Sequence, residues 1–512
     1  MVIGQVIGST SLRGFRFVIK EGMEKYVKRD EFVSVKETVT SNNILGIVKD
    51  IIISNELLPD EFGRDMRLAD IILKDGEYPV PTVKILGYET GEGLELPRHG
   101  IKPGTAVELA SDETLNRILK QSQEKAAYIG TLSTRDSINV SISVNELVSK
   151  HCAILAMTGA GKSYTVGVII EELMKKKGSV VVFDPHGEFK DMGFENSKVF
   201  ILGIEGANRI KIETGSLTTN DFINLIPDMT DTQRDLLDEI LSISYKFYEK
   251  YDLDVILKIL GILYDVKKSE ERGSKKEKVK IETDIFPEDI IAGITKKVGL
   301  STIGALTRRI KRLERMGIFE AHGTSLSDIV GKNQLTVIDL SEADERVSES
   351  IITAICREIF DARRQFVKGD DSEIKMPVFI IIEEAHNFAP RGMDERTVPS
   401  RQIIRKIARE GRKFGVGLCV VSQRPGQLDS DVLSQCNTQI IMKIVNPSDQ
   451  EYIRQSVESV TEDMVRDLPS LSRGEAIVVG SAIKLSVTVK IRKRTTEVSG
   501  EDIDIIGAWS EE

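Results

Sequence analysis

The chain has 512 residues, of which 40% are hydrophobic and 29% are charged, so it is long enough for two or three folded units, each with its own core. The formal net charge of -10 excludes a surface that is basic all over and confines any DNA-binding charge to a local patch. Four scattered cysteines without a C-x-x-C pair indicate neither a zinc site nor a disulfide framework, and the lack of a long apolar run favours a cytoplasmic protein with no membrane part.

Residues 1–110 are predicted to form a small β-barrel. Short apolar runs such as FRFVI, ILGIV and PTVKILGY alternate with Gly, Pro and Asn, and helical periodicity is poor.

Residues 111–212 and 331–512 predict the two parts of one α/β core. Wholly apolar runs such as HCAILAM, GSVVVFD and PVFIII alternate with helix-length segments, as in a parallel sheet covered on both faces. Between them, residues 213–330 show three- and four-residue apolar spacing and predict an inserted helical bundle. Its charged run at 266–280 fits either a solvated loop or a DNA contact. The segment from 475 predicts a closing β-hairpin, followed by an acidic tail.

The segment AMTGAGKS at 156–163 predicts a phosphate-binding loop, because it lies between an apolar strand-like run and a helix-like segment. Two glycines permit a tight loop that points backbone N–H groups inward, and the helix N-terminus adds a favourable dipole. Lys162 is expected to reach the β- and γ-phosphates, and Ser163 to bind Mg²⁺. The expected cofactors are ATP and Mg²⁺. The expected nucleotide-binding residues are Thr158, Gly159, Ala160, Gly161, Lys162, Ser163 and Tyr164.

Two adjacent acids end the apolar run VFIII and predict hydrolysis as well as binding. Glu383 is expected to hold Mg²⁺ through water, and Glu384 to act as the general base. Because neighbouring strand residues point to opposite sides, the two acids are expected to face apart. Two surface acids at a strand end are the alternative.

Two further strand ends carry polar residues. Asp184 and Glu188 could tune the metal or the attacking water, although a D-P-x-G turn explains the same residues. Gln423 could sense the γ-phosphate by hydrogen bonding or simply end its strand.

An arginine-rich stretch follows the acid pair. On a helix starting near Ser400, Arg401, Arg405, Arg409 and Arg412 are predicted to form one outward stripe, opposite a row of isoleucines. Arg409 or Arg412 is the candidate for an arginine that completes a neighbouring subunit's ATP site, with a solvated basic face as the alternative. The residues expected to contact the DNA backbone are Arg391, Arg396 and Arg401.

With these motifs in place, the chain resembles the HerA family of hexameric DNA translocases. The resemblance covers nearly the whole chain and rests on AMTGAGKS (156–163), FDPHGEF (183–189), IIEEAHNF (381–388), REGRKFG (409–415), SQRP (422–425) and GEAIVVG (474–480). It implies a RecA-like P-loop core with an N-terminal small β-barrel and an inserted helical bundle.

The same resemblance implies a homohexameric ring that pumps duplex DNA through its pore using ATP. It also implies work with a NurA-type nuclease in end resection during double-strand break repair. Two alternatives stay open from the residues alone: a pump for another polymer, either conjugative DNA or protein, and an ATP-switched platform that loads a nuclease.

Overall fold

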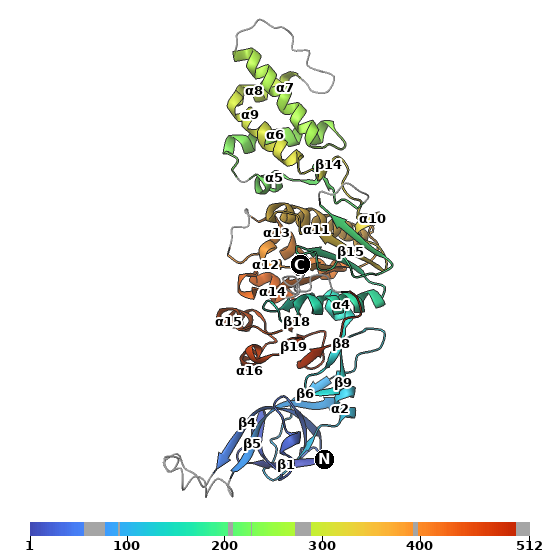
Figure 1. Cartoon of the computed structure of the whole chain (residues 1–512), viewed down its shortest axis with the longest axis vertical. Helices are drawn as coiled ribbons and strands as arrows, with labels where there is room; N and C mark the ends of the chain where they lie inside the picture. The colour runs from blue at the N-terminus through green and yellow to red at the C-terminus, as the bar shows by residue number, and fades with distance from the viewer. Residues whose placement is uncertain are drawn as a thin grey trace, which may run out of the picture. The chain divides into compact units, whose positions relative to one another are not determined.

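A computed structural model describes residues 1–55, 77–90, 93–202, 208–226, 228–271, 288–392 and 398–497 of the chain (Figure 1). Its internal contacts divide the chain into two compact units. The first consists of Met1–Ser143 and Thr461–Arg492, and the second of Val144–Val460 and Lys493–Glu512. Each unit is therefore built from stretches that lie far apart in the sequence.

The first unit begins with a closed β-barrel, as predicted. Its strands are β1 (Val2–Ile7), β2 (Gly14–Ile19), β3 (Phe32–Lys36), β4 (Asn43–Asn55), β5 (Glu77–Thr90), β6 (Gly93–Glu95) and β7 (Ala106–Leu109). They follow the order β2-β1-β7-β3-β4-β5-β6, and a second pairing, β2 with β5, closes the ring. A Cβ on Gly14 would lie 2.5 Å from the carbonyl oxygen of Val83, so glycine is needed where β2 meets β5.

The barrel core is filled by alternate residues of these strands, as the two-residue period of a strand requires. Phe15, Phe17, Val33 and Val107 are at most 3% exposed. On β2 the residue between Phe15 and Phe17 is the exposed Arg16, and outward residues of this kind set the charge of the barrel surface.

The rest of the first unit is a smaller antiparallel sheet in the order β19-β20-β8-β9. Its elements are α2 (Asp112–Leu119), β8 (Ala126–Leu132), β9 (Arg135–Ser143), α16 (Glu462–Asp467), β19 (Glu475–Gly480) and β20 (Val487–Ile491). The predicted C-terminal hairpin is confirmed in β19 and β20. The predicted boundary at residue 111 differs from the observed one, since the first stretch of the first unit runs to Ser143. The reason is that β8 pairs with β20, which joins residues 111–143 to the first unit.

The second unit has a parallel sheet, as predicted for strands that are apolar throughout. Its order is β12-β15-β11-β16-β17-β10-β18. The strands are β10 (Cys152–Leu155), β11 (Ser179–Asp184), β12 (Ser197–Ile201), β15 (Gln334–Asp339), β16 (Val378–Ile382), β17 (Val416–Ser422) and β18 (Thr438–Ile441). The helices of this core are α3 (Val144–Ser149), α4 (Lys162–Lys175), α10 (Leu326–Ile329), α11 (Glu345–Lys368), α12 (Ala385–Phe388), α13 (Pro399–Phe414), α14 (Ser430–Gln435) and α15 (Pro447–Ser456).

The predicted helical insertion leaves and re-enters this core through a short parallel pair, β13 (Ile212–Glu213) with β14 (Phe319–Glu320). It contains α5 (Thr219–Leu225), α6 (Asp231–Phe247), α7 (Leu253–Glu271), α8 (Glu288–Lys297) and α9 (Leu300–Glu314). The helices lie together as a bundle (Figure 1), with α7 packed between α6, α8 and α9. Of the charged run 266–280, residues 266–271 continue α7 and the remainder lies outside the described residues.

Candidate functional site

Four neighbouring parallel strands bring the sequence motifs to one edge of the sheet. β11 pairs with β16, β16 with β17, and β17 with β10, all in parallel. Their carboxyl ends therefore lie side by side, at the edge where open α/β sheets bind ligands. The phosphate-binding loop follows β10, the acid pair follows β16, and Gln423 follows β17.

The loop between β10 and α4 has the backbone of a phosphate cradle. Gly159 and Gly161 have φ angles of 79° and 104°, in a region that side chains disfavour. Gly161 caps α4, so the N–H groups of the first helical turn have no partner within the helix. Thr158 and Gly159 are exposed, Ala160 is buried, and Lys162 and Ser163 are half-buried. The hydroxyl of Tyr164 accepts a hydrogen bond from the backbone of Arg494 at 2.6 Å.

Lys162 lies between the two acids of the pair. Its Nζ is 3.1 Å from Oε2 of Glu383, and it donates a short hydrogen bond to Oε1 of Glu384. The prediction that the acids face apart is wrong, because the strand ends at Ile382 and Glu384 turns into the left-handed region with φ 49°. This turn brings both carboxylates to one cation.

The surroundings shift the pKa values of the two carboxyl groups in opposite directions. Burial raises the pKa of Glu383 to about 7, although the charge of Lys162 opposes the shift. Burial also acts to raise the pKa of Glu384, but the nearby His186 and the charge of Lys162 outweigh it and lower the pKa to about 2. Burial acts to lower the pKa of Lys162, but the two carboxylates raise it overall. Glu384 is therefore ionised at neutral pH.

Two histidines beside Glu384 were missed by the sequence reasoning. His186 Nε2 is 3.7 Å from Glu384 Oε1, and His386 Nδ1 is 3.3 Å from Glu384 Oε2. His386 also lies 3.1 Å from the hydroxyl of Ser422 at the end of β17. Their positions within DPHGE and EEAH were the available signal, since each lies within four residues of a strand end at the same edge.

Asp184 and Gln423 take different places at this edge. The buried carboxylate of Asp184 accepts hydrogen bonds from the backbone of His186, Gly187 and Phe189 at 2.9 to 3.2 Å, which favours the turn interpretation. The side chain of Gln423 instead accepts a 2.5 Å hydrogen bond from the Thr158 hydroxyl. Gln423 is thus tied to the phosphate-binding loop itself.

The donor set fits a hydrated divalent cation and a phosphate chain. Glu383 Oε1 and Glu384 Oε2 are buried and make no hydrogen bond to any residue that the structure describes, a costly state unless a further group fills it. The hydroxyl of Ser163 stands at the start of the same helix as Lys162. In the described ranges, no cluster of three or more His, Cys, Asp or Glu side chains could hold a metal. The Ser163 hydroxyl, one carboxylate of the acid pair and water are oxygen donors of the kind that Mg²⁺ prefers.

The arginines of α13 do not form the single outward stripe that was predicted. Arg401 is 9% exposed and bonds the Asp429 carboxylate at 2.8 Å, so the proposed DNA contact of Arg401 loses its basis. Arg405 and Arg409 both pair with Asp431. The helix therefore uses most of its cationic face to hold α14.

Arg412 differs from its neighbours on α13, because it is exposed and has no ion pair with any described residue. Arg391 is exposed too, and its guanidinium lies 4.5 Å from the ring centre of Tyr452. Arg396 falls outside the described residues.

Comparisons with known proteins identify the family to which the chain is related. Residues 127–359 match the family described as "Helicase HerA, central domain". The DNA double-strand break repair helicase HerA of Pyrococcus furiosus is 32% identical over 99% of this chain and 96% of its own length. The protein of the same name from Sulfolobus acidocaldarius is 30% identical over 99% of this chain and 97% of its own length.

Among solved structures, VirB4 of Thermoanaerobacter pseudethanolicus superposes with a TM-score of 0.51 and 17% identity, over 73% of this chain and 98% of that one. This likeness confirms the fold class alone. None of the helices in the described parts of the chain is both long and apolar enough to cross a membrane. Because relatives at 30% identity or more align along almost their full length, the chain belongs to the HerA family of helicases.

Proposed function

We propose that this protein is an ATP-driven motor that moves duplex DNA through the pore of a homohexameric ring. In the same proposal it works with a NurA-type nuclease to resect DNA ends at double-strand breaks. The observation that carries the ATPase part is the meeting of Lys162 with Glu383 and Glu384 at the end of a parallel strand. The DNA and repair parts draw on relatives that are named as DNA double-strand break repair helicases.

The residues divide the work of hydrolysis as follows. Lys162 and the first-turn N–H groups of α4 would hold the phosphate oxygens, with Thr158, Gly159, Ala160 and Gly161 shaping the loop. Ser163 and, through water, Glu383 would hold Mg²⁺, which supplies positive charge to the phosphates when bound. Glu384 would accept the proton of the attacking water, and Gln423 would sense the γ-phosphate from its place beside Thr158.

The ion pair gives the base a built-in control. With no phosphate near it, His186 and Lys162 together hold the pKa of Glu384 far below its usual range and make the carboxylate a weak base. Drawing the Lys162 ammonium toward a phosphate would remove part of that charge. The basicity of Glu384 would then rise only when the loop is filled, which limits wasted proton transfer.

The test is Mg²⁺-dependent ATP hydrolysis by the full chain, with and without duplex DNA. We expect duplex DNA to stimulate hydrolysis. Glu384→Gln and Lys162→Ala should each lower turnover by on the order of a hundredfold or more, the usual effect of losing a general base or a phosphate-binding cation. Lys175→Ala, which removes an exposed lysine from the far end of the same helix, should leave turnover unchanged.

Normal turnover in either site variant would refute the assignment of the site. Native mass spectrometry checks the six-subunit ring, and single-molecule tracking checks movement along DNA. Hydrolysis without movement would instead favour the nuclease-loading platform.

A further inference from the structure

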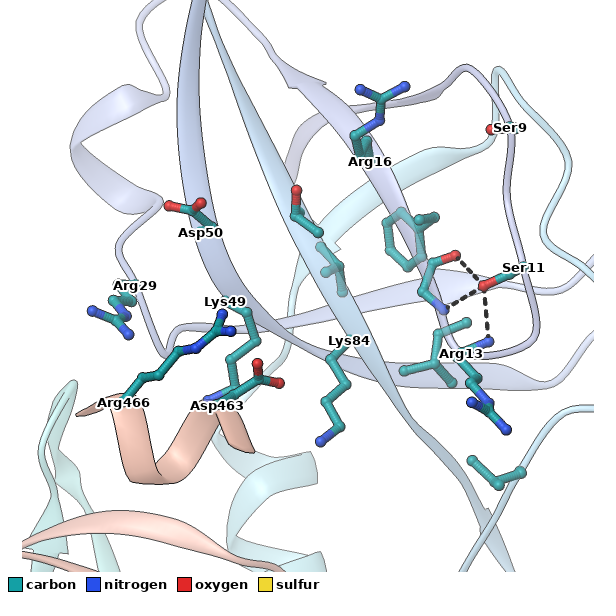
Figure 2. Close-up of a pocket in the computed structure, with 16 residues that line it drawn as sticks. Ser9, Ser11, Arg13, Arg16, Arg29, Lys49, Asp50, Lys84, Asp463 and Arg466 are labelled. Carbon is teal, nitrogen blue, oxygen red and sulfur yellow. Dashed lines mark hydrogen bonds between the residues drawn. The ribbon is translucent and has the colours of Figure 1, made fainter. Parts of the chain in front are cut away.

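The outer face of the β-barrel carries a basic pocket that the proposed ATP site does not use (Figure 2). Its volume is about 980 Å³, and it lies entirely within the first unit. The floor is the outward face of β2, β5 and β4, which are neighbours in the barrel. The loop 9–13 and helix α16 form its rim, as Figure 2 shows for Ser11 and Arg466.

The pocket is strongly cationic although the whole chain is acidic. Its lining has six cationic side chains against two carboxylates, and the cations are Arg13, Arg16, Arg29, Lys49, Lys84 and Arg466. Half of these cations are already neutralised by carboxylates outside the lining: Lys49 by Asp30, Arg29 by Asp467, and Arg466 by Glu462.

The other three cations, Arg13, Arg16 and Lys84, form no ion pair with any residue that the structure describes. Arg16 lies on β2, directly beside β5, which carries Lys84. Arg13 is placed by a tight turn in which the hydroxyl of Ser11 accepts hydrogen bonds from the backbone of Arg13 and Gly14, both at 3.1 Å. These three cations line one pocket and have no ion-pair partner among the described residues, so together they favour an anionic ligand with repeated charge.

The side chains that line the pocket limit the class of ligand that it can bind. The one aromatic residue among the described lining residues is Phe15, which is 3% exposed and belongs to the barrel core. No ring is therefore available to stack on an unpaired base, as single-strand binders require. Arginine and lysine side chains around serine hydroxyls suit phosphate oxygens instead.

We infer that this pocket binds the phosphate backbone of nucleic acid, as a sequence-independent contact outside the proposed ATP site. The inference rests on the proposed function for its choice of nucleic acid as the polymer. Binding through phosphates alone predicts no preference for single strands over duplex.

The experiment compares the full-length protein with a triple variant, Arg13→Gln, Arg16→Gln and Lys84→Gln. Binding of a fluorescent duplex is measured by anisotropy over a range of salt concentrations. Because each phosphate contact adds about 0.9 to the slope of log affinity against log salt, the variant should lose about two to three from that slope. At moderate salt its affinity should fall roughly tenfold to a hundredfold.

A matched variant removes the same charge from the same unit outside the pocket: Lys20→Gln, Lys36→Gln and Lys102→Gln, all exposed in the structure. It should keep the wild-type slope. Unchanged thermal melting and unchanged basal ATP hydrolysis in both variants show that folding and the ATP site are intact, since none of the six positions lies in that site.

The outcomes separate the two proposals. A wild-type protein that binds no duplex overturns the proposed function. If the wild-type protein binds duplex and the pocket variant binds it with the same affinity and salt slope, only the pocket assignment is overturned. The same holds if the matched variant loses as much affinity and slope as the pocket variant. Polyglutamate that competes as well as a duplex of equal charge would mean that the pocket receives an acidic protein, and this also overturns the nucleic-acid assignment.

Discussion

Glu384 combines a side chain proposed for catalysis with a backbone that its residue type disfavours. Its φ of 49° lies in the left-handed region, where a residue with a Cβ costs about 1 kcal/mol or more relative to glycine. Such strain persists when the surroundings impose it, and here the turn is what points the carboxylate back to Lys162. Had the strand continued through Glu384, the carboxylate of Glu384 would have pointed to the face opposite that of Glu383.

This strain gives a prediction that separates backbone from side chain. Glu384→Ala and Glu384→Gly both remove the carboxylate and should both abolish ATP hydrolysis. The glycine variant should be more stable than the alanine variant by about 1 kcal/mol, because only glycine accepts this φ without a steric cost. Thermal unfolding of the two variants measures the difference. Equal melting temperatures would show that the turn is unstrained.

At the residue scale, the sequence was enough to find the chemistry but not its geometry. Lys162, Glu383 and Gln423 could be predicted because each follows an apolar strand, and parallel strands end at one edge. The convergence of both acids on Lys162 could not be predicted, since it depends on the single φ angle of Glu384. The burial of Arg401 could not either, because its partner Asp429 lies 28 residues further on.

At the scale of elements, α13 and α14 are joined by charge rather than by apolar contact alone. Arg401 bonds Asp429 through both Nε and Nη2 at 2.8 Å, while Asp429 caps α14 by accepting from the backbone of Asp431 and Val432. The pair is buried, so its removal leaves a carboxylate with less compensation in a poorly solvated place. This arrangement predicts a structural role for Arg401.

Arg401→Gln should therefore destabilise the second unit by about 2 to 3 kcal/mol, less than a fully uncompensated buried charge because Arg405 stays 3.7 Å from Asp429. Duplex affinity per folded molecule should be unchanged. Thermal melting and anisotropy measure the two effects. Arg454→Gln, which breaks an exposed pair with Glu451, is the control and should cost at most about 1 kcal/mol. A loss of DNA affinity with normal melting would restore Arg401 as a DNA contact.

Among the elements, those with local signals were predictable and those made by distant pairing were not. The parallel strands follow from apolar runs such as VVVF before Asp184, and the bundle follows from helical spacing. In contrast, β8 and β9 carry a strand pattern that does not reveal their partner. β8 pairs with β20, more than 350 residues later, and β9 pairs with β8, so both belong to the first unit.

At the scale of the whole molecule, the proposed ring requires that one subunit complete the ATP site of the next. Two arginines of α13 are candidates for this contact, and the structure distinguishes them. Arg409 is held by Asp431 of its own chain, whereas Arg412 is exposed without an ion pair to a described residue. Arg412 can thus reach a neighbour without first breaking a bond, and we propose it as the trans-acting arginine.

Mixed rings test this assignment. Rings of Arg412→Ala alone and rings of Lys162→Ala alone should both be inactive, the first for lack of the arginine and the second for lack of the phosphate-binding cation. In a mixed ring, an Arg412→Ala subunit keeps an intact ATP site and can receive the arginine of a Lys162→Ala neighbour. Random assortment at equal amounts makes about a quarter of the head-to-tail interfaces complete. ATP hydrolysis should therefore reappear on mixing, with subunit exchange verified by native mass spectrometry.

If the arginine acts within its own chain, every site lacks one component and mixing restores nothing. The same mixture is then made with Arg409→Ala subunits in place of Arg412→Ala subunits. Activity that is lost in the single variant and returns on mixing identifies the arginine that makes the contact.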